Sequence, residues 1–140
     1  MLIGYLRVNP TDACTLPRVI KKEMHPLEED QVTAFLKEVQ GSPHENLYKI
    51  ALFTGLREGE ILGLGWEHID LENGILTVKR QLRKEQKKGG QYYFSPPKNN
   101  RARSISLAPS VVLLFRLQKL EQNSMRMEAG DAWQENGLVF

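Results

Sequence analysis

An arginine and an acid lie three residues apart in a stretch that could bind an anion. Arg57 follows the break Thr54-Gly55, and Glu60 comes three positions later. On a helix, this spacing places both side chains on one face. A cation in the first helical turn opposes the helix dipole, at a cost of roughly 0.3 kcal/mol or more. The same guanidinium, beside backbone N–H groups that have no helical partner, makes a pocket for a phosphate or another anion.

The segment around this pair resembles a known catalytic motif. Residues 51–70 read A-L-F-T-G-L-R-E-G-E-I-L-G-L-G-W-E-H-I-D. This string is similar to the first catalytic box of the tyrosine recombinases, the phage-integrase family, which reads T-G-L-R-x-x-E-(I/L)-x-x-L-x-W-x-x-(I/V)-(D/N). The resemblance implies that Arg57 binds the non-bridging oxygens of the scissile phosphate and that Glu60 orients Arg57 or supports the pocket. An ordinary helical hairpin with a solvated Arg and Glu is the alternative interpretation of the motif.

A second segment resembles the lysine hairpin of the same family. Residues 96–107 read P-P-K-N-N-R-A-R-S-I-S-L, and the resemblance implies that Lys98 protonates the leaving 5′-oxygen as a general acid. An ammonium on a flexible stem can contact a phosphate and also give up a proton, whereas arginine holds its proton too tightly. Because the family's hairpin varies in length, Lys87 or Lys88 is an alternative for this lysine.

The rest of the family's catalytic set is an H-x-x-R box, a further His or Trp, and a nucleophilic Tyr. The three histidines of this chain open H-P-L-E, H-E-N-L and H-I-D-L, and no tyrosine follows Tyr93. We therefore expect the front half of a catalytic domain, from a truncated recombinase or a decayed gene, that is inactive by itself. The histidines pair with no His, Cys or acid at ligand spacing, so no metal site is expected.

Positive charge is concentrated in one part of the chain. Residues 79–103 hold nine Lys/Arg and one acid, Glu85, whereas the whole chain has a formal net charge of only +2. Such asymmetry indicates a surface that faces a polyanion. We expect contacts with the DNA backbone from Lys79, Arg80, Arg83, Lys84, Lys87, Lys88, Arg101 and Arg103.

Helical periodicity predicts four helices that would carry these residues. They are expected over 28–39, from about 43 to 54, over 57–64 and over 109–123. Ser42 and Glu45 have the spacing of a capping box for the second helix, with Ser42 as N-cap. The second helix is expected to bury Leu47, Ile50, Ala51 and Phe53, and the fourth Val111, Leu114, Phe115, Leu117 and Leu120.

Alternating apolar residues predict three strands, over 75–82, 92–95 and 103–107. Asn73-Gly74 is a turn signal before the first strand. We expect one three-stranded antiparallel sheet with basic edge loops. Residues 124–136 are polar and predict a loop, and residues 138–140 predict a buried segment or the start of a strand.

Composition limits the class of protein. With 140 residues, 41% of them hydrophobic, the chain can form one modest core. It has no apolar run of membrane length, and its single Cys14 excludes an intramolecular disulfide and a cysteine-cluster metal site. The expected fold is α+β: mostly helical with a small antiparallel sheet, a partial integrase-like catalytic domain over 23–140 preceded by an interdomain linker over 1–22.

The expected function is site-specific DNA recombination or integration of a mobile element such as a prophage. The resemblance implies metal-free DNA breakage and rejoining, with no cofactor and no small-molecule substrate. Double-stranded DNA is the expected partner, the family implies a tetramer on DNA, and one cysteine fits a reducing cytoplasm. Two alternatives are a non-catalytic DNA-binding or regulatory module that keeps the half-fold, and a domain whose basic face binds an acidic protein.

Overall fold

The structure, a computed structural model, describes residues 9–15, 23–98 and 100–140. Its helices are α1 (Glu29–Glu38), α2 (Glu45–Thr54), α3 (Glu58–Leu62) and α4 (Pro109–Ala129). Its strands are β1 (Ile69–Asp70), β2 (Ile75–Val78), β3 (Gln81–Lys84), β4 (Tyr92–Ser95) and β5 (Arg103–Ser106). All strand pairs are antiparallel, in a three-stranded sheet of order β1-β2-β5 and a two-stranded sheet β3-β4. The predicted α+β class is confirmed.

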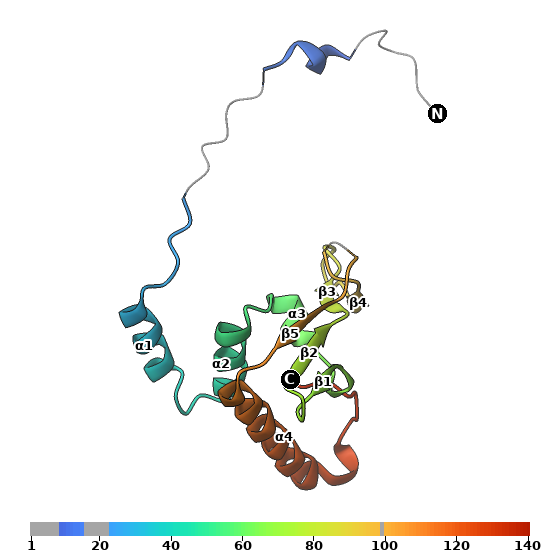
Figure 1. Ribbon diagram of the computed structural model, residues 1–140. Helices are drawn as coiled ribbons and strands as arrows, with labels where there is room; N and C mark the ends of the chain where they lie inside the picture. Colours follow the sequence, from blue (N-terminus) through green and yellow to red (C-terminus); the bar gives the residue numbers. More distant parts are fainter. Residues whose placement is uncertain (1–8, 16–22, 99) are drawn as a thin grey trace.

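The core lies between the three-stranded sheet and the helices α2, α3 and α4 (Figure 1). Phe115 of α4, Ile50 of α2 and Leu76 of β2 are all 0% exposed. Alternation along β2 explains its part in the core, because Leu76 and Val78 face inward while Ile75 is exposed. Val139, near the end of the chain, is also buried and donates its N–H to the carbonyl of Leu64. The predicted buried segment over 138–140 is therefore confirmed.

The predicted strand over 75–82 is wrong, because the chain changes sheets in its middle. β2 pairs with β5, whereas β3 pairs with β4 as a hairpin that projects away from α4 (Figure 1). Lys79 and Arg80 lie at the crossing, where the Nε atom of Arg80 donates to the carbonyl of Gly63. The third strand of the larger sheet is instead β1, which reaches β2 through the predicted turn at Asn73-Gly74.

The fourth helix is longer than predicted, and fewer of its apolar side chains are buried than predicted. α4 continues through residues 124–129, which were expected in a loop, because those residues include no Gly or Pro until Gly130 ends the helix at a positive φ of 52°. Val111 and Phe115 are buried as expected, but Leu117 and Leu120 are 46% and 65% exposed. In α2, Phe53 is likewise exposed, contrary to expectation.

The predicted capping box at the start of α2 is also wrong. The N-cap is His44, and the carboxylate of Glu45 accepts from the N–H of Gly41 rather than from Ser42. Within the described residues, the Ser42 hydroxyl is buried and has no hydrogen-bond partner. The predicted end of α2 is confirmed, because Gly55 caps it in the left-handed conformation (φ 63°).

The expected linker falls largely outside the described residues. Within 1–22, the structure describes only 9–15, where Pro10–Ala13 forms a short 3-10 helix. The Asn9 side chain accepts a hydrogen bond from the Thr11 N–H at its start. No helix of the described part of the chain is long and apolar enough to cross a membrane.

Candidate functional site

Arg57 is the N-cap of α3 rather than a residue of its first turn. Gly55 turns the chain out of α2, and Arg57 has an extended backbone (φ −70°, ψ 154°). Its N–H donates to Glu60 Oε2 at 2.9 Å. The backbone N–H of Arg57 is therefore not free to bind an anion, contrary to the expectation from the sequence. The side chain remains 61% exposed and can therefore reach a ligand in solution.

Glu60 is the buried anchor of this region, with only 1% of the residue exposed. Its carboxylate accepts from Arg57 Nη1 at 3.1 Å, besides the Arg57 backbone. From β5, Arg103 donates Nη1 to Oε1 at 2.7 Å and Nη2 to Oε2 at 2.8 Å, the two-pronged geometry of a strong charge-assisted pair. These bonds, first of all those from Arg103, lower the pKa of Glu60 from 4.5 to about 2.

Arg103 was expected to contact DNA, but the structure places it against Glu60. The bond to that carboxylate raises the pKa of Arg103 above its ordinary value. The inward position of Arg103 could have been predicted from the sequence. Ile105 lies on the inward face of β5, and the two-residue period of a strand puts Arg103 on the same face. A buried carboxylate also requires cations beside it. Arg57 is one such cation for Glu60, and Arg103 is the second.

Lys98 lies in a turn between β4 and β5, where the Asn100 N–H donates to the Pro97 carbonyl at 2.8 Å. This turn borders a hollow of about 530 Å³ next to Arg57. The described lining is strongly basic and includes no acid: Gly55, Arg57, Pro97, Lys98, Arg101, Ala102 and Arg103. Four cationic side chains around one hollow suit an anion with several oxygens, such as a phosphate.

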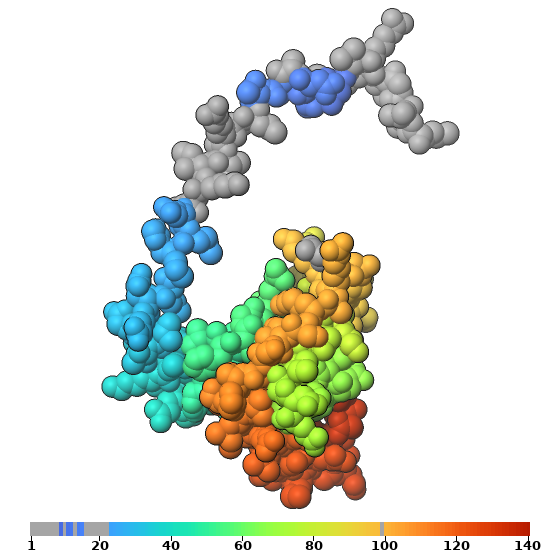
Figure 2. Space-filling view, in the orientation of Figure 1, coloured from blue at the N-terminus to red at the C-terminus, as the bar shows by residue number. Residues whose placement is uncertain are grey.

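The remaining predicted DNA contacts lie along the β3–β4 hairpin and just beyond its two ends. Lys79, Arg83, Lys84, Lys87, Lys88 and Arg101 are exposed. The hairpin rises from the body beside the region of α2 and α3 (Figure 2), so its cations can reach an extended polyanion. Arg80 is partly buried and contacts Glu67 and the ring of Phe94. Lys87 pairs with Glu85 at 2.9 Å.

Within the part of the chain that the structure describes, neither the alternative lysines nor the tyrosines line the basic hollow. Lys87 and Lys88 belong to the tip between β3 and β4 and do not line it, whereas Lys98 does. Tyr48 packs edge-on against Phe35 in α1, and Tyr93 lies on the exposed strand β4. Among the described residues, no group of three or more His, Cys, Asp or Glu could hold a metal ion.

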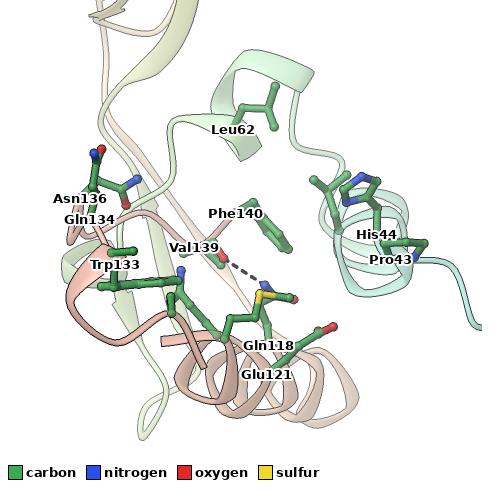
Figure 3. Close-up of a pocket in the computed structure, with 15 residues that line it drawn as sticks. Pro43, His44, Leu62, Gln118, Glu121, Trp133, Gln134, Asn136, Val139 and Phe140 are labelled. Carbon is green, nitrogen blue, oxygen red and sulfur yellow. Dashed lines mark hydrogen bonds between the residues drawn. The ribbon is translucent and has the colours of Figure 1, made fainter. Parts of the chain in front are cut away.

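Another cavity, of about 580 Å³, is lined mostly by apolar rather than basic residues. Figure 3 shows it between the start of α2, the second half of α4 and the C-terminal segment, where Gln118 donates to the Val139 carbonyl. Apolar side chains such as Leu62, Trp133 and Phe140 line it, and the described lining has no Lys or Arg. This cavity therefore lacks the groups that a phosphate needs.

Comparisons with known proteins agree with this geometry. The chain is 27% identical over 156 aligned residues to a protein named tyrosine recombinase XerC-like from Caldanaerobacter subterraneus subsp. tengcongensis, covering 98% of this chain and 39% of that protein. It is 30% identical to the prophage integrase IntR of Escherichia coli K12, covering 89% of this chain and 29% of the relative. The chain thus spans well under half the length of these curated relatives.

Solved structures give the same result. A structure of the Tn1549 transposon integrase in complex with transposon right end DNA superposes with a TM-score of 0.63 and 31% sequence identity, covering 70% of this chain and 32% of that chain. A second structure of that integrase, in complex with a circular intermediate DNA, gives a TM-score of 0.62 and 29% identity over 72% and 33% of the two chains. Residues 25–131, most of the chain, match the description "Phage integrase family". The chain therefore belongs to the phage integrase family.

Proposed function

We propose that residues 23–140 are part of the catalytic domain of a DNA-cleaving tyrosine recombinase, with residues 1–22 as the linker before it. The recombinase would integrate or excise a mobile element such as a prophage. The observation that carries the proposal is the basic hollow in which Arg57 and Lys98 lie together, with Glu60 buried behind Arg57. The similarity to an integrase solved in complex with DNA supports double-stranded DNA as the partner.

Arg57, Glu60 and Lys98 would have different roles in DNA cleavage. Arg57 would bind the non-bridging oxygens of the scissile phosphate and offset the charge of the pentacovalent transition state. Glu60 would hold Arg57 by its side chain and its backbone, at 3.1 and 2.9 Å. Lys98 would donate a proton to the leaving 5′-oxygen. Attack by a tyrosine on the phosphate would form the covalent link, and this attack requires groups beyond the hollow.

The exposed cations of the hairpin and of the residues beside its ends would bind the DNA backbone around this phosphate. They are Lys79, Arg83, Lys84, Lys87, Lys88 and Arg101. Arg80 and Arg103 would act mainly within the protein, because both already contact acids. For the whole recombinase, we propose a tetramer on DNA and a cytoplasmic location.

A second candidate function is DNA binding without cleavage. The 140 residues contain no H-x-x-R sequence, so the basic hollow could serve a binding or regulatory module that keeps this half of the fold. A domain that binds an acidic protein is a third candidate, because it would use the same positive surface.

The salt dependence of duplex binding tests the DNA proposal. If about five cations reach phosphates, the logarithm of the affinity should fall with the logarithm of the salt concentration with a slope of about −4 to −5. Fluorescence anisotropy with a labelled duplex measures this slope, and the combined change of Lys84, Lys87 and Lys88 to Gln should flatten it. Competition with polyglutamate is the control. An affinity for the duplex that does not change with salt would contradict the phosphate contacts, and equal competition by polyglutamate per charge would favour an acidic protein partner.

A further inference from the structure

We propose that a second hollow, on the hairpin side of Arg57, binds a single unstacked nucleobase of the DNA whose phosphate Arg57 holds. This inference rests on the proposed function. The hollow has a volume of about 520 Å³ and lies between α3 and the β3–β4 hairpin. Arg57 lines both this hollow and the one that contains Lys98. One guanidinium therefore faces both, so a phosphate and its neighbouring base could occupy them together.

Tyr92 supplies the stacking surface. It is 65% exposed although it lines the hollow. Lys84 lies directly opposite on β3, with its Nζ 5.2 Å from the centre of the tyrosine ring. Phe94 is two residues further along the same face of β4. The guanidinium carbon of Arg80 lies 4.4 Å from the centre of its ring. Exposed rings interleaved with cations are the arrangement with which proteins bind unpaired nucleotides, because each base stacks while the cations contact the backbone.

The lining of this hollow differs from that of the basic hollow in ways that suit a base. Besides the cations Arg57, Arg83 and Lys84, it includes the apolar residues Leu62 and Leu82. Gly59 allows the close approach of α3 to β3, since a Cβ there would lie 2.6 Å from the Leu82 carbonyl oxygen. Glu58 adds a negative charge to the lining, whereas the described lining of the basic hollow has no acid. That carboxylate would repel a phosphate but can accept a hydrogen bond from an exocyclic amino group of a base.

The test compares two labelled duplexes that differ by one extrahelical nucleotide. We expect the chain to bind the bulged duplex about tenfold more tightly than the perfect one. Tenfold corresponds to about 1.4 kcal/mol, which one base stacked on an aromatic ring can contribute. Tyr92→Ala should remove this preference and Tyr92→Phe should keep it. Tyr93→Ala, on the opposite face of β4, is the matched control and should change nothing. Circular dichroism confirms that each variant is folded.

Two further measurements separate stacking from the flexibility of a bulge. A bulge with an abasic nucleotide keeps the kink but has no base, so it should bind like the perfect duplex. A bulged 2-aminopurine should show quenched fluorescence on binding, and Tyr92→Ala should restore it. Equal affinity for bulged and perfect duplexes would overturn this inference and leave the proposed function intact. If neither duplex binds, the proposed function fails, and the inference fails with it.

Discussion

At the scale of single residues, the site depends on a carboxylate that is nearly inaccessible to water. Glu60 is 1% exposed, so its charge is stable only because Arg103 and Arg57 donate to both of its oxygens. Removing one partner of such a buried pair costs far more than a surface ion pair contributes. The rigid carboxylate in turn fixes the start of α3, and with it the position from which Arg57 extends.

Acid should therefore destabilise the protein through Glu60. The folded state lowers the pKa of this group from 4.5 to about 2, so the unfolded chain binds the proton more readily. The stabilisation is complete above about pH 5 and is lost as the pH falls towards 2. We expect the free energy of unfolding, measured with urea, to fall by roughly 3 kcal/mol across this range.

Glu60→Gln identifies the group responsible. This variant should be less stable at pH 7 and should lack most of the fall between pH 5 and 2. Glu45→Gln is the control, because the pKa of Glu45 is also lowered, by Lys49, but its side chain is 27% exposed rather than fully buried. An undiminished fall in Glu60→Gln would show that other carboxylates govern the acid response.

The role of Arg57 in strand cleavage can be tested by substitution. In a recombinase that carries this segment in a complete catalytic domain, Arg57→Lys should nearly abolish strand cleavage while duplex binding stays largely intact. Lysine keeps the charge but lacks the two prongs that grip two phosphate oxygens. Cleavage of a labelled substrate and anisotropy with the same duplex measure the two activities. Full cleavage by Arg57→Lys would assign Arg57 a structural role.

At the scale of elements, the short helix α3 joins the basic hollow to the hairpin. It packs on β3 through Gly59 and Gly63, where an added Cβ would lie 2.6 and 2.7 Å from backbone atoms of Leu82. Backbone atoms cannot move aside as the end of a flexible side chain can. Small residues at these two positions therefore bring Arg57 and the cations of β3 onto adjoining surfaces.

Gly59→Ala separates local helix propensity from this packing. Propensity alone would stabilise the helix by about 1 kcal/mol. Overpacking of a tight contact costs about 1–3 kcal/mol, and at 2.6 Å the clash should win. We expect Gly59→Ala to lower the midpoint of urea unfolding. Glu58→Ala, at an exposed position of the same helix, should change the midpoint little. A higher midpoint for Gly59→Ala would mean that the hairpin moves without cost.

Sequence patterns predicted the elements better than their partners. Periodicity located α1, α2, β4 and β5 almost to the residue, and Gly55 and Asn73-Gly74 marked real turns. The crossing between β2 and β3 was missed, because alternation continues through residues 75–82 and cannot show that the hydrogen-bonding partner changes. The pairing of Arg103 with Glu60 was missed for a related reason: a basic run suggests a solvated face, and only the strand period reveals which cation points inward.

At the scale of the whole molecule, the basic run of residues 79–103 is separated from most of the acidic residues. The β3–β4 hairpin lies towards one end of the body, whereas α4 lies towards the other (Figure 1). The net charge of +2 hides this separation. A polyanion would therefore meet the residues around Arg57 first, which is the arrangement that electrostatic steering requires.

The chemical inventory of these 140 residues leads to the last prediction, which is that they form no covalent complex with DNA by themselves. Arg57 and Lys98 could stabilise charge and donate a proton, but neither act breaks a phosphodiester without an attacking oxygen. Tyr48 packs against Phe35, and Tyr92 and Tyr93 lie on β4 without an H-x-x-R partner in the sequence. Tyr5 lies outside the described residues.

A nicked suicide substrate tests this prediction, because it traps any cleavage intermediate. The labelled DNA should run unshifted on a denaturing gel after incubation with the chain, although anisotropy shows that it was bound. A complete recombinase of the same family is the positive control for the substrate. A shifted band that protease removes would reveal an attacking residue among these 140. Replacing each of the four tyrosines with Phe in turn would then identify it, since the loss of one phenol oxygen removes the nucleophile and little else.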